Sequence, residues 1–211
     1  MNRKSNYGIF EVITNIIDLL ISKCFFSSVR LIRLPFYVRG KKYIDFGKQI
    51  TLGRYCRFDV LGTHESKILS FGDNVVVGDN VRISCIEKIR IGNNVLIGSR
   101  VLIIDNAHGK YDGQDADTPY TPPNLRTLQS EPIEVGDNVW IGGNTVILPG
   151  VHIGDNVVIG GGSVVTKDIP DWSIAAGNPC KVIRKITEED KQYYFRDRKF
   201  DDEAWEVIKN L

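Results

Sequence analysis

The sequence predicts an all-β solenoid, and three observations support this fold class. From residue 135 onwards the chain divides into blocks of six residues that begin with an aliphatic side chain: VGDNVW, IGGNTV, ILPGVH, IGDNVV, IGGGSV and VTKDIP. Segments 46–63, 71–88 and 91–108 divide in the same way, with an apolar first position. Glycine fills the second position of all ten first and second blocks and of none of the five third blocks. The period is therefore 18 residues, and three short extended segments per period form a triangular coil.

Residues 1–42 precede the repeat and are expected to form a basic, partly helical cap. They contain eight basic and two acidic residues. The apolar run YGIFEVITNIIDLLISKCFF is interrupted by Glu11, Asp18 and Lys23, so a membrane-spanning helix is not expected. It also lacks a small-residue cleavage site, which argues against a signal peptide. Covering the open end of the solenoid is the expected role; peripheral contact with an anionic membrane surface is the alternative.

The repeat domain is expected to span residues 43–186 in about five coils of 18 residues. Aliphatic residues alternate along each extended segment, glycine turns the corners, and asparagine at the fourth position tolerates left-handed backbone. Every insertion follows a third block, so all insertions leave from one corner of the triangle. The longest is the polar, proline-rich loop 109–134, and loops of this length are usually functional. His108 immediately precedes it.

Residues 187–211 are expected to form a C-terminal helix, because Thr187 followed by acidic residues is typical of a capped helix start. The four cysteines lie far apart and form no CxxC pair. That spacing argues against a zinc site or a disulfide framework and favours a reducing cytoplasm. The formal net charge is +1, and no nucleic-acid partner is expected.

The segment VWIGGNTVILPGVHIGDNVVIGGGSVVTKDIPDWSIAAGNPCKVIR resembles the C-terminal signature of the hexapeptide-repeat acyltransferases. The similarity is greatest to surface-polysaccharide O-acetyltransferases and to the maltose and galactoside acetyltransferases, and it covers roughly residues 40–186. The resemblance implies a left-handed parallel β-helix, a hand that runs against the usual crossover rule. It also implies a homotrimer with active sites between subunits, where acetyl-coenzyme A lies in the groove between neighbouring β-helices.

By this resemblance His108, in the stretch DNAHG, matches the family's catalytic histidine. It would act as a general base on a sugar hydroxyl while that oxygen attacks the thioester carbonyl. An alcohol is a weak nucleophile at neutral pH, and an imidazole titrates in that range. A backbone N–H would stabilise the oxyanion. Three residues flank His108 with hydrogen-bonding groups and are candidates for binding the acceptor: Asp105, Asn106 and Asp112.

The resemblance also implies positions that contact the cofactor. They are Trp140 near the thioester, then Gly143, Gly161 and Thr166 along the pantetheine arm, and Lys167, Lys181 and Arg184 near the nucleotide and its phosphates. Two positions depart from the family pattern, because Gly161 and Cys180 stand where alanine is common. Gly161 keeps the backbone N–H, and Cys180 is small enough to fit.

His152 occupies the sixth position of its third block, as His108 does, one coil later. Standard strand spacing would stack the two in one column about 5 Å apart. The related γ-class carbonic anhydrases bind a metal through three histidines, two of them close in sequence. Here His64, His108 and His152 are each separated by 44 residues. No metal site is therefore expected, and His152 is expected to line the groove or to be exposed.

These features predict an acetyl-coenzyme A-dependent O-acetyltransferase that acts in the cytoplasm or at the inner face of the membrane. The acceptor would be a sugar hydroxyl of a bacterial surface polysaccharide (lipopolysaccharide, capsule or exopolysaccharide) or of its precursor, including a lipid-linked glycan. One alternative is N-acetylation of an amino-sugar nucleotide, although such enzymes often carry a nucleotide-binding α/β domain for which the first 42 residues are too few. The other is a non-catalytic β-helix with a binding or structural role.

Overall fold

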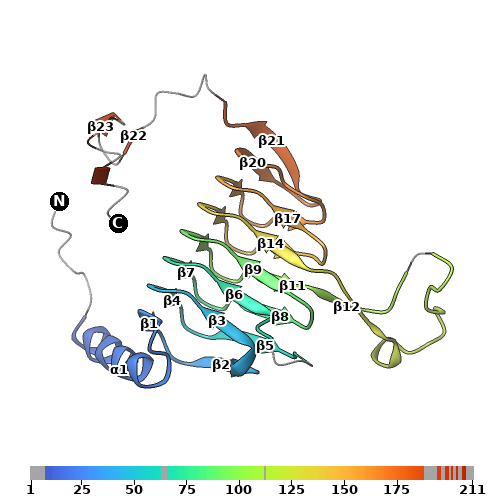
Figure 1. Cartoon of the computed structure of the whole chain (residues 1–211), viewed down its shortest axis with the longest axis horizontal. Helices are drawn as coiled ribbons and strands as arrows, with labels where there is room; N and C mark the ends of the chain where they lie inside the picture. The colour runs from blue at the N-terminus through green and yellow to red at the C-terminus, as the bar shows by residue number, and fades with distance from the viewer. Residues whose placement is uncertain are drawn as a thin grey trace.

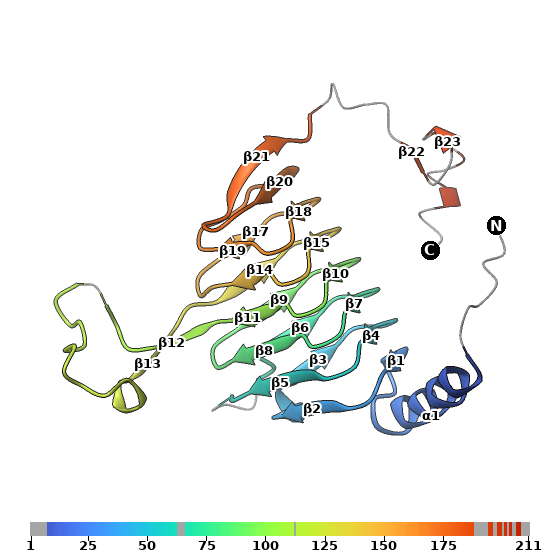
Figure 2. The ribbon, with the colours of Figure 1, turned by 180° about the vertical axis from the view of Figure 1, so that it is seen from behind.

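The computed structural model describes residues 8–62, 66–111 and 113–187, together with isolated residues between 194 and 207. Three sheets form the faces of a triangular prism, and successive coils stack along its long axis (Figure 1). One helix lies beside the N-terminal coil, and an arm projects from one edge of the prism (Figures 1 and 2). With its parallel sheets built from hexapeptide blocks, the architecture fits the expected left-handed β-helix.

The first sheet has eight strands and is parallel except for its last strand. The strands are β1 (Leu31–Ile32), β4 (Thr51–Leu52), β7 (Val76–Val77), β10 (Leu96–Ile97), β15 (Trp140–Ile141), β18 (Val158–Ile159), β20 (Ser173–Ala176) and β21 (Lys181–Lys185). Strand β21 folds back antiparallel onto β20, so the sheet ends in a hairpin instead of another coil.

The other two sheets are wholly parallel. The second contains β2 (Phe36–Arg39), β5 (Cys56–Val60), β8 (Arg82–Cys85), β11 (Leu102–Ile104), β16 (Val146–Ile147) and β19 (Val164–Val165). The third contains β3 (Ile44–Phe46), β6 (Leu69–Phe71), β9 (Ile89–Ile91), β14 (Ile133–Val135) and β17 (His152–Ile153).

The repeat residues play the roles that the pattern predicts. Valine and isoleucine fill the interior of the prism. A Cβ atom on Gly142 would lie 2.4 Å from the backbone nitrogen of Gly161, so no side chain fits at this second position. The fourth-position asparagines adopt positive φ, and their amides form a ladder along one corner. The hydrogen-bonded steps are Asn74 to Asn94 and Asn94 to Asn138, both 3.1 Å, and Asn138 to Asn156, 3.3 Å.

The ladder begins earlier than the expected boundary at residue 43. Strands β1 and β2 pair with β4 and β5, and with β3 they form a coil ahead of those that the repeat predicts. The 3₁₀ helix η1 (Lys41–Tyr43) connects β2 to β3. Inside this coil, the ring of Phe26 lies edge-on to Phe36 and Phe46, with centroids 6.0 and 5.8 Å apart. The residue that follows α1 (Ile9–Phe25) thus packs against the first coil.

The described residues meet the expected C-terminal helix over 187–211 only in part, since Glu203, Glu206 and Val207 are helical. Strands β22 (Tyr194–Phe195) and β23 (Arg198–Lys199) pair antiparallel, so extended backbone stands where helix was expected. Backbone hydrogen bonds between two strands compete with the local bonds of a helix. The six residues that would follow the proposed Thr187 cap lie outside the described part of the chain.

The long excursion forms an arm between β11 and β14. Strands β12 (Asn106–His108) and β13 (Leu128–Ser130) pair antiparallel, and the 3₁₀ helix η2 (Pro123–Leu125) precedes β13. At the base, the Glu131 nitrogen donates to the Asp105 carbonyl at 2.9 Å. The chain therefore leaves the prism after Asp105, ahead of the expected start of the loop at residue 109.

Candidate active site

His108 is the last residue of β12, on the arm and outside the prism. Its side chain is exposed, and among the described residues its imidazole forms no hydrogen bond or ion pair. Its backbone pairs with Leu128 of β13. The residue is thus held by its main chain, while both ring nitrogens stay available to an incoming group.

The base of the arm is fixed by Asp105, which is fully buried. Its carboxylate accepts hydrogen bonds from the backbone nitrogens of Ile86, Glu87 and Lys88 at 2.9 to 3.1 Å and from the Asn106 amide at 2.9 Å. These donors occupy both carboxylate oxygens, so neither is left to bind the acceptor sugar. The expectation that Asp105 binds substrate is therefore not met, because this carboxylate anchors the arm to the preceding coil.

Asn106 is also held at the base. Its amide nitrogen donates to the carbonyl of Ser84 at 3.3 Å and to its hydroxyl at 3.2 Å, and the residue is largely buried. Asp112 lies outside the described residues. Of the three acceptor candidates, the structure thus places two at the root of the arm, where they set its direction.

Two residues that the sequence did not single out brace the backbone of His108. The Tyr111 hydroxyl donates to the His108 carbonyl at 2.5 Å and accepts from Arg126 Nη1 at 2.8 Å. The Arg126 guanidinium also lies 5.5 Å from the centre of the Tyr111 ring and donates to the Thr121 carbonyl at 2.9 Å. Arg126 is the only arginine in residues 109–134. This feature of the sequence could have identified it as a candidate.

A hollow of about 360 Å³ opens at the arm, but it does not include His108. Its lining consists of Ala107, Gly109, Lys110, Tyr111, Gln129, Ser130, Glu131 and Pro149. Alternate residues of a strand point to opposite sides, so Ala107 and Gly109 face the hollow while His108 faces the other side. The imidazole therefore projects from the side of the arm that faces away from this hollow.

The expected stacking of His152 on His108 is wrong. His152 pairs in register with Glu134, and its Nδ1 lies 3.8 Å from a Glu134 carboxylate oxygen. The prediction assumed that the chain stays on the ladder up to residue 108, whereas it departs after Asp105. His152 is exposed and borders a separate hollow of about 250 Å³ that also includes Arg90, Glu134 and Asp155.

Two of the expected cofactor residues share one column of the first sheet. Trp140 pairs with Val158, Val158 with Ile174, and Ile174 with Arg184. At roughly 4.8 Å per strand, this column separates Trp140 from Arg184 by about 14 Å. Trp140 is 51% exposed, so an indole face lies at one end of the column and a guanidinium-bearing residue at the other. Lys181 lies on the same final strand.

Gly143 and Gly161 stack in successive coils at the corner next to this column. The Gly162 nitrogen donates to the Gly143 carbonyl at 2.8 Å. A Cβ on Gly161 would lie 3.1 Å from that carbonyl oxygen, so the stack leaves a track without side chains. Such a track exposes backbone amides to an extended ligand.

Thr166 and Lys167 are not part of this group. They follow β19 at the next corner, where the chain passes from the second sheet to the third, and both are exposed. The arm leaves from the same corner two coils earlier, after β11. The expected cofactor residues therefore divide between two edges of one prism.

The comparisons with known proteins agree with the hexapeptide-repeat fold. The family model "Bacterial transferase hexapeptide (six repeats)" matches residues 132–167. The putative lipopolysaccharide biosynthesis O-acetyl transferase WbbJ of Escherichia coli K12 is 40% identical over 186 residues, which cover 88% of this chain and 93% of that protein. The chain belongs to the hexapeptide-repeat acyltransferases.

Two solved structures resemble this acyltransferase. The maltose O-acetyltransferase of Clostridium difficile 630 is 38% identical with a TM-score of 0.57, and the match covers 70% of this chain and 73% of that one. A galactoside acetyltransferase in complex with coenzyme A is 30% identical with a TM-score of 0.50, and the match covers 93% and 82%.

An arginine cluster (Arg39, Arg57 and Arg82) surrounds Asp59 on the outer face of the second sheet of this acyltransferase. The carboxylate of Asp59 lies 2.7 Å from Arg57, 3.6 Å from Arg82 and 4.0 Å from Arg39. The Arg57 hydrogen bond is the main reason that the pKa of Asp59 lies below its ordinary value. Three cations around one carboxylate leave net positive charge beside a hollow of about 200 Å³.

The arginine cluster lies close to the base of the arm. Asp59 pairs in register with Ser84, the residue to which the Asn106 amide is hydrogen-bonded. Sequence reasoning missed the cluster, although Arg57 and Arg82 both occupy the last position of a second block. Because residues at the same block position stack in successive coils, this shared position could have indicated that the two arginines lie side by side.

The buried thiols of this acyltransferase are poor nucleophiles. Burial, with a smaller contribution from the Asp105 carboxylate, raises the pKa of Cys85, and burial raises the pKa of Cys56 to about 11. A thiol attacks as its thiolate, so His108 is better placed than either cysteine to promote acyl transfer. Within the described residues, no group of three or more His, Cys, Asp and Glu side chains could hold a metal ion.

Proposed function

We propose that this acyltransferase transfers an acetyl group from acetyl-coenzyme A to a sugar hydroxyl of a bacterial surface polysaccharide or its precursor, in the cytoplasm, with His108 as the general base. The observation that carries the proposal is the placement of His108. Its imidazole is exposed and unpaired among the described residues, while its backbone is held by β13 and Tyr111. A base must reach its proton in a fixed geometry, and this arrangement supports that role.

The imidazole would accept the hydroxyl proton as the sugar oxygen attacks the thioester carbonyl. The new C–O bond forms, the C–S bond breaks, and the imidazolium returns the proton to the departing thiolate. A backbone N–H aimed at the carbonyl oxygen would stabilise the developing charge, an effect of about 3–4 kcal/mol in other acyl-transfer enzymes. The exposed amides beside the glycine track at Gly143 and Gly161 are the candidates for contacting the donor's extended arm.

A homotrimer would unite residues that lie apart in one chain. The Trp140–Arg184 column and the glycine track occupy one edge of the prism, while the arm, Thr166 and Lys167 occupy another. In a groove between two neighbouring prisms, one subunit would supply the first edge and the other subunit the second. Trp140 would then face the thioester, and Lys167, Lys181 and Arg184 would face the phosphates, where cations are favourable partners.

The acceptor would carry phosphate as well as the reacting hydroxyl. The arginine cluster supports this class, because it places net positive charge on the sheet that carries Ser84 and the base of the arm. Guanidinium groups bind phosphate in bidentate fashion. A lipid-linked or nucleotide-linked glycan precursor has such a phosphate, whereas a free sugar does not. The name of WbbJ, which refers to lipopolysaccharide biosynthesis, is consistent with this choice.

The proposal is tested with labelled acetyl-coenzyme A and a panel of free sugars, sugar nucleotides and lipid-linked oligosaccharides. Wild-type protein should label a hydroxyl of one acceptor, and His108→Ala should lose most of the transferase rate. Thermal shift with coenzyme A should give equal stabilisation of both proteins, which separates a lost base from a lost cofactor site. Unchanged turnover in His108→Ala would show that another group takes the proton.

N-acetylation of an amino-sugar nucleotide is the second candidate, because the same histidine could deprotonate an ammonium group. The same panel decides between the two, since hydroxylamine releases an acetyl ester from the product but leaves an acetamide intact. Failure of coenzyme A to stabilise the protein would instead favour a non-catalytic β-helix.

A further inference from the structure

Helix α1 turns its apolar side away from the protein. Ile9 and Phe10 expose 74% and 82% of their area, whereas the two buried residues of the helix, Asp18 and Ser22, are polar. A helix that packs on a protein core normally buries its apolar side, so α1 has the opposite orientation. We call the exposed set the outer face of α1: Ile9, Phe10, Val12, Ile13, Ile16, Ile17, Leu19, Leu20 and Phe25.

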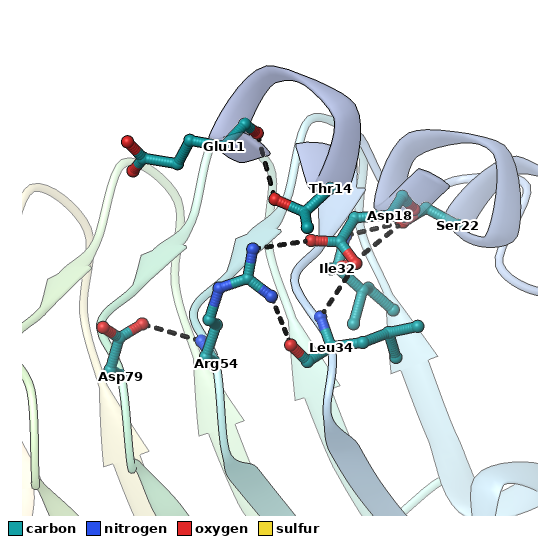
Figure 3. Close-up of polar contacts among 8 residues, drawn as sticks. All are labelled: Glu11, Thr14, Asp18, Ser22, Ile32, Leu34, Arg54 and Asp79. Carbon is teal, nitrogen blue, oxygen red and sulfur yellow. Dashed lines mark hydrogen bonds and ion pairs between the residues drawn. The ribbon is translucent and has the colours of Figure 1, made fainter. Parts of the chain in front are cut away.

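Polar contacts lock this orientation (Figure 3). Asp18 lies 3.1 Å from the Arg54 guanidinium and accepts a hydrogen bond from the Leu34 nitrogen at 3.2 Å. The Ser22 hydroxyl accepts from the Ile32 nitrogen at 2.7 Å and donates to the Asp18 carbonyl at 2.6 Å. Turning the outer face inward would separate a buried carboxylate from its cation, which is strongly unfavourable.

Among the described residues, the hollow on the inner side of the helix is too polar to receive these side chains. A hollow of about 230 Å³ lies between α1 and the neighbouring coils, and its lining is polar throughout: Glu11, Asn15, Arg33, Arg54 and Asp79. None of the described residues covers the outer face, so it must be covered by something else or stay in water at a cost in free energy.

Unpaired positive charge surrounds the C-terminal end of α1. Lys23, Arg30 and Lys41 hydrogen-bond to backbone or hydroxyl oxygens at 3.2, 2.9 and 2.5 Å. Within the described residues, none of these three side chains, nor Lys42, forms an ion pair with a carboxylate. All four are exposed. The apolar outer face thus ends in a cationic rim.

We infer that the outer face of α1 lies in the surface of an anionic lipid bilayer, with the cationic rim on the lipid headgroups. An apolar face combined with nearby Lys and Arg is the arrangement of helices that lie within a membrane interface. No helix in the described part of the chain is long and apolar enough to cross a bilayer. A second copy of the chain would bring the same cations to the contact and be repelled, whereas anionic lipid attracts them.

Membrane docking would also bring the proposed site to its acceptor. The helix lies at the N-terminal end of the prism (Figure 2), and the arginine cluster starts on β2 of the first coil. A phosphate near the bilayer would then meet the arginines first, with the glycan extending along the second sheet towards the arm. This last step rests on the proposed function, whereas the docking itself does not.

The docking is tested by sedimentation of the full chain with two kinds of vesicle, phosphatidylcholine alone and phosphatidylcholine mixed with phosphatidylglycerol. Wild-type protein should partition onto the anionic vesicles and dissociate from them as salt is raised. The double variant Ile13→Glu/Ile17→Glu should bind at least about tenfold more weakly. Leu61→Glu, which alters an exposed apolar residue outside α1, should bind as wild type does.

Absence of wild-type binding to the anionic vesicles at low salt would overturn the inference, as would equal binding of the double variant. Sedimentation velocity of the same proteins supplies the second readout. A double variant that dissociates into smaller species would show that α1 covers another subunit, which also overturns it. Transfer of acetyl to a soluble acceptor should be unchanged in the double variant, so a failed docking test leaves the transferase proposal standing.

Discussion

The substitution Asp105→Asn should destabilise the protein and loosen the arm that carries His108. The carboxylate accepts hydrogen bonds from three consecutive backbone nitrogens and one side-chain amide. An asparagine keeps one acceptor oxygen and turns its NH₂ group towards donors. It therefore loses about two charge-assisted bonds of roughly 1.5–3 kcal/mol each, a total of about 3–6 kcal/mol in the free energy of unfolding.

Urea unfolding followed by tryptophan fluorescence measures this loss, and steady-state kinetics measures its effect on the site. If Asp105 positions His108 without contacting substrate, kcat should fall while the KM for acetyl-coenzyme A stays within about twofold. Asp73→Asn is the matched control, because Asp73 is an exposed carboxylate that accepts one backbone hydrogen bond, from Lys48. Its cost should be below about 1 kcal/mol. Equal losses in both variants would refute the anchoring role of Asp105.

Three further outcomes are expected. Iodoacetamide at pH 8 should modify the exposed Cys24 in the native protein, while Cys56, with a pKa raised to about 11 by burial, should react only after unfolding; mass spectrometry of the peptides decides. The hydrogen bond from Arg57 lowers the pKa of Asp59 in the folded protein. This carboxylate therefore stabilises the fold at pH values above its pKa in the unfolded chain, which is about 3.9. The contribution is lost as the pH falls through the lower pKa of the folded state. Asp59→Asn should therefore flatten the acid side of a plot of Tm against pH, and an unchanged slope would contradict the linkage. Gly142→Ala should cost at least about 2 kcal/mol in urea unfolding, since its Cβ would lie 2.4 Å from a backbone nitrogen of the next coil; wild-type stability would show that the corner can relax.

The solenoid could be predicted because the backbone constraints that form it recur at the same positions of each coil. Glycine at the second position is required by a close backbone approach that recurs in successive coils, as the 2.4 Å distance at Gly142 shows. The fourth position has positive φ, which asparagine adopts more readily than most residues. The first coil escaped prediction because β1 and β2 carry neither residue, and Phe26, Phe36 and Phe46 stabilise it instead.

The site was predicted less completely, for two physical reasons. Periodicity could not show where the chain leaves the ladder, so His152 was placed beside His108 when it pairs with Glu134. Composition marked Asp105 as a polar neighbour of His108 but could not show that backbone amides saturate it. The orientation of α1 was equally hidden, because an amphipathic pattern gives the two sides of a helix and not which of them faces the protein.

The hydrogen bond between Glu131 and Asp105 at the root of the arm means that the excursion starts and ends at nearly the same point. The coils before and after it therefore stack as they would if a tight turn joined them, as β11 on β16 and β9 on β14 show. The arm is therefore an insertion that leaves the stacking of the coils unchanged. The length and sequence of the arm can therefore change without altering the register of a single strand, and under the proposed function such a change would alter which hydroxyl is acylated.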